Sequence, residues 1–193
     1  MTKDARIGKR LRLLALALTA IVTIVVCQAL FDPIAIIKNS ARLSRIRAEL
    51  PAAEARWRAQ DMSDYEIDVQ GSSFACHIRG TLSVRGGELV AVAMREDPSD
   101  PTSALVPVDP EAWHIRGCAY EEMTVPRFFE RVERTLEEIS VADATVSVTF
   151  DNELGYVTEY SYAAGYRRGL LNPVISDGWV RYSIEDLRPV VGP

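Results

Sequence analysis

A run of nineteen uncharged residues, from Leu13 to Phe31, constrains this chain more than any other feature. At a rise of about 1.5 Å per residue, a helix of this length just covers a hydrocarbon core of about 30 Å. The sequence therefore predicts a transmembrane signal anchor at 13–31, with the membrane as a partner. A cleaved signal peptide and a lipoprotein signal are the alternatives, but the run is long for the former, and Val26 before Cys27 is bulky for the latter.

Charge is distributed unevenly about this run. Residues 1–31 hold five basic residues and one acid, which leaves 17 basic and 26 acidic residues in 32–193, a net charge of −9. By the positive-inside rule, residues 1–12 form a cytoplasmic basic tail and the rest of the single-pass protein lies outside the cell membrane. An acidic domain is repelled by phosphate backbones, so no nucleic-acid partner is expected.

Residues 32–61 are predicted to form a juxtamembrane helical stalk, kinked or divided at Pro51. Apolar residues recur there at spacings of three and four, which places them on one helical face: Leu43, Ile46, Leu50, Ala53 and Trp57. We expect this stripe to pack on the following domain. A dimerising coiled coil is the alternative, although the segment holds fewer than three clean heptads.

From residue 62 to residue 188 the pattern predicts an extracytoplasmic α+β domain. Apolar and polar residues alternate over 65–70 and 76–85, as in half-buried strands. Gly86-Gly87 supplies the positive φ of a tight hairpin, and 89–94 forms the return strand, with Val90, Val92 and Met94 on one face. Four prolines in 95–112 favour a long loop without regular structure.

An amphipathic helix follows, with Thr124 as its N-cap, Pro126 in its first turn and an apolar stripe that ends at Ile139. Alternation then resumes over 144–150, 156–162 and 179–184, and the tail from Pro189 is expected to fray. The prediction is an antiparallel sheet of five to seven strands, covered by this one amphipathic helix.

Several of these pieces are arranged as in a known family of bacterial envelope domains. They are Trp57 with Tyr65, the Cys76 strand with its Gly86-Gly87 hairpin, Thr124-Val125 with Phe128 and Phe129, and Phe150-Asp151 with Leu154-Gly155-Tyr156. Over residues 55–187 the chain resembles this family of unknown function, found mostly in secreted lipoproteins and single-pass proteins. The chain departs from the pattern at Val157, where the family has proline, and lacks the lipidation cysteine. The resemblance implies an envelope location and a compact α+β fold, and it carries over no activity.

Cys76 and Cys118 fall in the exported part, where an oxidising setting permits a disulfide between them. Two buried free thiols are the alternative. His77 and His114 lie near the cysteines in sequence and complete a zinc-like ligand composition. The adjacent Cys76 and His77 point to opposite faces of a strand, however, so no metal site is predicted.

No catalytic or cofactor-binding residue is predicted. Ser72, Ser73, His77 and Asp97 supply the residue types of nucleophilic catalysis, without a flanking signature. The carboxylate pairs, Glu121 with Glu122 and Asp97 with Asp100, are typical of a solvated surface. Asp97, Asp100 and Asp109 could supply oxygens to calcium, but they lack the spacing of known calcium-binding loops.

The last predicted strands carry several tyrosines and a tryptophan, whose side chains combine an apolar ring with a polar O–H or N–H. Aromatic residues on a strand face usually pack in the core or pair across strands, and a binding surface is the alternative for four of them: Tyr156, Tyr160, Tyr162 and Trp179. The sequence favours a non-enzymatic module that binds a protein or envelope component. An extracytoplasmic hydrolase is the runner-up, and a structural subunit of a membrane complex is a third option.

Overall fold

The computed structural model describes residues 3–74, 76–115, 118–139, 144–164 and 178–190, without the side chains of 3–15, 24–36, 114, 115 and 118. The chain divides into two compact units, residues 1–40 and 41–193. One helix, α1 (Lys3–Ala59), contributes to both units. The second unit carries every other element.

Helix α1 is uninterrupted and passes through Pro33 and Pro51. Among the described residues, no helix has both the length and the apolar character that a membrane crossing requires. The predicted transmembrane helix at 13–31 is therefore wrong. The uncharged run is one section of a longer helix that continues on both sides into charged segments, and most of the segment predicted as a stalk is part of that helix.

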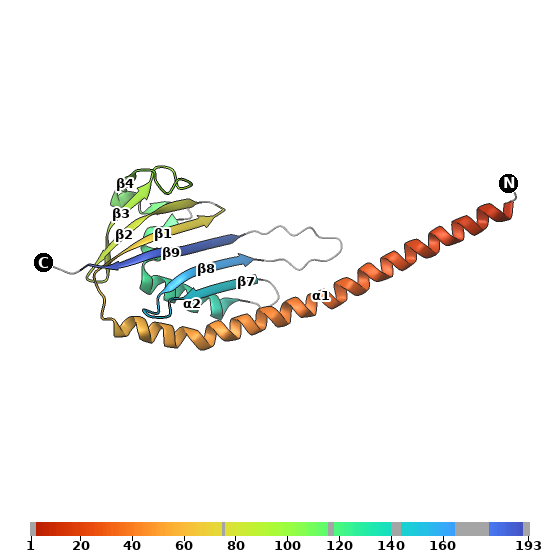
Figure 1. The fold of residues 1–193 in the computed structure, drawn as a ribbon, viewed down its shortest axis with the longest axis horizontal. Helices are drawn as coiled ribbons and strands as arrows, with labels where there is room; N and C mark the ends of the chain where they lie inside the picture. Colours follow the sequence, from red (N-terminus) through yellow and green to blue (C-terminus); the bar gives the residue numbers. More distant parts are fainter. Residues whose placement is uncertain (1–2, 75, 116–117, 140–143, 165–177, 191–193) are drawn as a thin grey trace. The chain divides into compact units, whose positions relative to one another are not determined.

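A seven-stranded antiparallel sheet forms the second unit, in the order β4-β3-β2-β1-β9-β8-β7 (Figure 1). Its strands are β1 (Tyr65–Ser73), β2 (His77–Arg85), β3 (Glu88–Arg95), β4 (Leu105–Pro107), β7 (Ala144–Phe150), β8 (Val157–Ala164) and β9 (Trp179–Pro189). The remaining elements are the short pair β5 (His114–Ile115) and β6 (Cys118–Ala119), the 3-10 turns η1 (Pro110–Ala112) and η2 (Tyr120–Met123), and helix α2 (Val125–Glu138). The predicted α+β class is confirmed.

Strand alternation sets the two faces of the sheet. In β1 and β2 every second residue is buried, because side chains of a strand point alternately to either face. Gly86 and Gly87 have φ values of 58° and 81°, as the predicted hairpin requires. The prediction for β3 was wrong at Val90, which is 50% exposed. A register shift between Ser83 and Val84 leaves Val90 as an extra residue, and this bulge turns its side chain outward.

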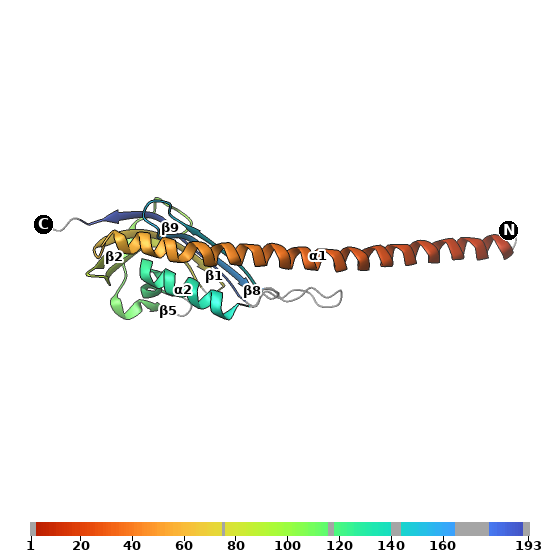
Figure 2. The ribbon, with the colours of Figure 1, turned by 90° about the horizontal axis from the view of Figure 1, so that it is seen from below.

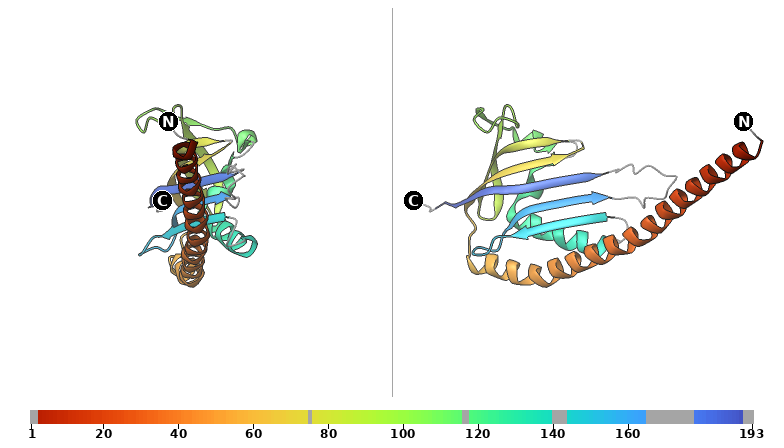
Figure 3. Two further views of the ribbon diagram at one scale, coloured as in Figure 1. Left: turned by 90° about the vertical axis from the view of Figure 1, so that its right-hand side faces the viewer. Right: turned by 45° about the vertical axis from the view of Figure 1, so that its right-hand side comes forward.

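Two helical segments, and not one, cover the inner face of the sheet. The predicted stripe of α1 is buried in the same core as α2, together with the inward residues of the strands. Figure 2 shows α2 alongside the last turns of α1, and the left view in Figure 3 shows α2 on one side of the strands. Arg47 of α1 donates a hydrogen bond of 2.8 Å to the carbonyl oxygen of Leu136, one of the last carbonyls of α2.

The first turn of α2 is held by Tyr65 of β1. Thr124 occupies the predicted N-cap position but makes no capping hydrogen bond, and its hydroxyl donates to the carbonyl oxygen of Glu121. The Tyr65 hydroxyl instead accepts a hydrogen bond of 3.3 Å from the N–H of Val125. The Tyr65 ring meets Trp57 of α1 edge to face, with ring centroids 5.4 Å apart. One buried side chain thus joins β1, α1 and α2.

The C-terminal strand lies in the middle of the sheet. β9 pairs with β1 from Ser73 to Tyr65 and with β8 on its other side. It extends to Pro189, beyond the predicted end at 184, because pairing with β1 continues past an irregularity at Asp68/Val69. The stretch 95–112, predicted as an irregular loop, contains η1 and the edge strand β4, where Pro107 is tolerated because no further strand needs its N–H.

Gly155 marks the closest approach of α1 to the turn between β7 and β8. Its φ is 87°, and a Cβ placed on it would lie 2.2 Å from the carbonyl oxygen of Ala53 and 2.9 Å from Cβ of Arg56. Ala53 itself is fully buried. Both the backbone conformation and the contact therefore require glycine at this position.

We expect Gly155→Ala to lower the free energy of unfolding by about 3 kcal/mol, from a left-handed φ that costs about 1–2 kcal/mol and overpacking that costs about 1–3 kcal/mol. Gly86→Ala is the matched control, because its φ is also positive but nothing lies within 4 Å of the added Cβ. Urea unfolding of both variants measures the difference. Equal losses would contradict the close contact between Gly155 and α1.

We expect Tyr65→Phe to cost about 1 kcal/mol at neutral pH, because it leaves the N–H of Val125 without its acceptor. Burial raises the pKa of Tyr65 to about 12 from 10.0, and the hydrogen bond from Val125 lowers it by less. The folded-state pKa is the higher one, so this contribution is fully present below pH 10 and is lost as the pH rises toward 12. Urea unfolding between pH 8 and about pH 11 should therefore show a steeper loss in the wild type than in Tyr65→Phe. Parallel pH profiles would contradict the burial of an ionisable hydroxyl.

Candidate functional site

Two exposed aromatic side chains lie at one end of the sheet. Ser73 of β1 pairs with Val180 of β9, so Phe74, which follows Ser73, and Trp179, which precedes Val180, end neighbouring strands. Phe74 is 90% exposed and Trp179 is 41% exposed. We call these two residues the aromatic tip. Figure 1 shows the turn between β1 and β2 and the start of β9 at the same end of the sheet.

The β1–β2 turn holds Phe74 in place through its backbone. The N–H of Ser73 donates a hydrogen bond of 2.7 Å to the carbonyl oxygen of Cys76, which closes the turn around Phe74. Among the exposed large hydrophobic side chains of the described residues, Phe74 and Trp179 are the aromatic ones, and aromatic side chains are enriched at protein interfaces. The sequence offered one signal that could have found Phe74, an aromatic residue in the short break between two alternating segments.

The structure separates the four residues predicted as a binding surface. Tyr156 and Tyr160 are buried, Tyr162 is half-buried against the core, and Trp179 alone presents a largely exposed face. The Tyr160 hydroxyl lies 2.9 Å from the hydroxyl of Thr135 on α2, and burial raises the pKa of Tyr160 above its ordinary value. Of the predicted set, only Trp179 belongs to the aromatic tip.

A polar row crosses the outer face of the sheet next to the aromatic tip. Ser72 pairs with Arg181 of β9 on one side and with His77 of β2 on the other. Oγ of Ser72 lies 3.3 Å from Nδ1 of His77. Asp97, at the end of β3, is near enough to His77 for the imidazole to help lower the pKa of the carboxyl group, although hydrogen bonds from Ser99 lower it more.

This row contains the residue types of a catalytic triad without its geometry. Oδ1 of Asp97 accepts from the N–H and hydroxyl of Ser99, so it is committed to its own loop. Ser72 and His77 line neither of the two hollows described below, and His77 is exposed to water. A nucleophile needs a base oriented by a third group and a site that holds the substrate. The row is therefore better suited to contacts than to covalent catalysis.

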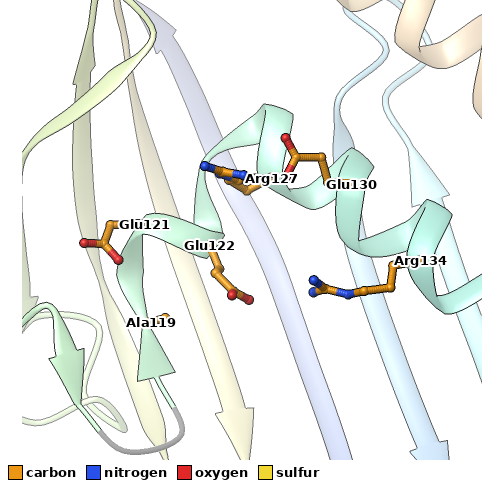
Figure 4. Close-up of a pocket in the computed structure, with 6 residues that line it drawn as sticks. All are labelled: Ala119, Glu121, Glu122, Arg127, Glu130 and Arg134. Atoms are coloured by element: carbon orange, nitrogen blue, oxygen red, sulfur yellow. Dashed lines mark hydrogen bonds and ion pairs between the residues drawn. The ribbon is translucent and has the colours of Figure 1, made fainter.

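The larger hollow, of about 260 Å³, lies between η2 and α2. It is lined by Ala119, Glu121, Glu122, Arg127, Glu130 and Arg134 (Figure 4). Arg127 and Glu130 form an ion pair of 2.6 Å, and this hydrogen bond raises the pKa of Arg127. Glu122 pairs with Arg131. Glu122 and Glu130 are thus engaged with arginines of α2, and the hollow is a charged surface rather than an apolar pocket for a ligand.

Arg131 has a structural role beside this hollow. Its side chain is 13% exposed, and its guanidinium lies 4.6 Å from the ring centroid of Tyr182 and 5.9 Å from that of Phe128. A cation over two aromatic faces, with a carboxylate partner, stabilises the packing of α2 on β9.

A smaller hollow of about 60 Å³ lies on the outer face, among ion pairs that cross strands. Arg79 donates to both oxygens of Glu185 at 2.8 and 2.9 Å, and Arg188 donates to both oxygens of Asp68 at 3.0 Å. Exposed pairs of this kind contribute at most about 1 kcal/mol each. They account for the polar character of this face.

Acidic residues named as calcium-type oxygens make local hydrogen bonds. Oδ1 of Asp97, Asp100 and Asp109 each accepts from the backbone two residues further on. In the part of the chain that the structure describes, no three His, Cys, Asp or Glu side chains converge as metal ligands would. The side chains of His114 and Cys118 lie outside that part.

A family model matches residues 49–162, from within the last turns of α1 to within β8. This chain belongs to DUF6174, a family of unknown function. No match is found among curated proteins. The resemblance to an uncharacterised family is confirmed, whereas the bacterial-envelope and lipoprotein character that it implied stays a prediction. The DUF6174 match ends before β9, the strand that joins the two halves of the sheet.

The pairing of Cys76 with Cys118 stays a prediction. We expect a non-reducing peptide map of the native DUF6174 chain to contain one peptide that links the two residues. A disulfide is stable only in an oxidising compartment, so the link would also support export. Reduction with dithiothreitol before digestion is the control. Two separately alkylated thiols in the unreduced sample would contradict the pairing.

Proposed function

We propose that this DUF6174 domain is a non-enzymatic binding module whose contact surface is centred on the aromatic tip. The observation that carries the proposal is the 90% exposure of Phe74 beside Trp179. Aromatic side chains are enriched at protein interfaces, because they bury large areas at a low cost in conformational entropy. Elsewhere on the outer face, arginine and acidic side chains form ion pairs with each other. Their charges are satisfied within the domain, so the aromatic tip is the favoured place of contact.

The hydrolase alternative has one observation in its favour, the 3.3 Å contact between Ser72 and His77. A hydrolase would require a third group to orient His77. The nearby carboxylate, that of Asp97, is instead hydrogen-bonded to Ser99. Binding needs no such orientation. We therefore favour a polar contact of this row with a partner over a reaction at Ser72.

We also propose that the domain works outside the cytoplasm. The support is the resemblance of residues 55–187 to envelope domains, and a Cys76–Cys118 disulfide, which persists in an oxidising compartment, would add to it. The net charge of −9 over residues 32–193 suits a protein partner better than an anionic lipid surface or a nucleic acid.

Photo-cross-linking tests the contact surface. Benzoylphenylalanine replaces Phe74 in one variant and Val90, an exposed apolar residue at the opposite end of the sheet, in the control. Irradiated cells that express the full chain should give a discrete adduct from position 74 and none from position 90. Trp179→Ala should reduce the adduct, whereas the same pattern from both positions would contradict the proposal.

A further inference from the structure

An acidic loop lies at the same end of the sheet as the aromatic tip. The loop connects β3 to β4 over residues 96–104 and carries Glu96, Asp97 and Asp100, all exposed and without a basic residue among them. Asp97 is close enough to His77 for the imidazole to influence the pKa of its carboxyl group. His77 pairs with Ser72, which precedes Phe74 by two positions. The loop and the aromatic tip therefore border one surface.

The loop is built to keep its carboxylates charged. Oδ1 of Asp97 accepts from Ser99 and Oδ1 of Asp100 accepts from Thr102, and these hydrogen bonds lower the pKa of both carboxyl groups. Ser103 donates to the carbonyl oxygen of Asp97 at 3.0 Å, which closes the loop. Among the described residues at this end, the exposed Arg181 is paired with Glu159 at 2.8 Å. The charge contributed by the acidic loop is therefore negative.

The shape of the surface is equally informative. Phe74 stands on a turn between two strands and is almost fully exposed, so it protrudes. A protruding aromatic side chain is buried most completely when it enters a concave, apolar site on another protein, as the central anchors of interfaces do. A flexible peptide offers no such site, and an anionic lipid surface is repelled by the acidic loop.

We infer that the partner of the aromatic tip is a folded protein with an apolar pocket rimmed by lysine or arginine, into which Phe74 inserts while the acidic loop pairs with the rim. This inference rests on the proposed binding function and adds the chemistry of the partner. Desolvation of Phe74 supplies the affinity, and the loop steers association and fixes orientation.

The test uses full-length protein with benzoylphenylalanine at position 74, irradiated in native extract, with the attachment site mapped by mass spectrometry. We expect one protein, joined at an apolar site flanked by basic residues.

Asp97→Asn with Asp100→Asn should lower the initial cross-linking rate by about tenfold at low salt. The difference should vanish at about 1 M salt, where screening reaches roughly 3 Å. Asparagine keeps the oxygen that each loop hydrogen bond needs, and Glu88→Gln, an exposed change at the opposite end, is the control.

Each other outcome has a distinct meaning. If the rate of adduct formation changes neither with the Asp97/Asp100 substitutions nor with salt, the basic rim is overturned and the binding function is left intact. Adducts of position 74 with lipids in vesicles containing phosphatidylglycerol would overturn the protein partner. No adduct at position 74 beyond that at position 90 would overturn the binding function itself.

Discussion

The buried Tyr65 side chain is the contact on which the second unit depends. Its ring packs edge to face on Trp57, its strand is central in the sheet, and its hydroxyl serves the first turn of α2. A helix N-terminus buried in a core must satisfy its free N–H groups, and Thr124 does not do so here. A phenolic hydroxyl reaches across the core for this purpose while its ring adds apolar area.

Sheet topology makes the unit one cooperative body. β1 to β4 and β7 to β8 are each joined by local connections, but the two groups have no pairing with each other. β9 lies between them and pairs with both β1 and β8. The last strand of the chain therefore completes the fold, and the contact of Gly155 with Ala53 fixes α1 to the far group.

The proposed contact surface lies outside the packed core. The inner face is occupied by α2 and by the buried stripe of α1, and the outer face carries cross-strand ion pairs. Phe74 and Trp179 are both exposed at the end of the sheet where β1 ends and β9 begins. The acidic loop follows β3, which ends on the same side of the sheet.

The sequence by itself determined the local features: the α+β class, the alternation in β1 and β2, the Gly86-Gly87 hairpin and the apolar stripe of α2. These depend on periods of two or 3.6 residues and on backbone sterics, which a chain carries within each segment. Tertiary structure decided the central place of β9 and the outward turn of Val90. It also buried Tyr156 and Tyr160 and exposed Phe74 beside Trp179. Those outcomes depend on which strands become neighbours and on what covers each face, contacts between residues far apart in the chain that no local pattern encodes.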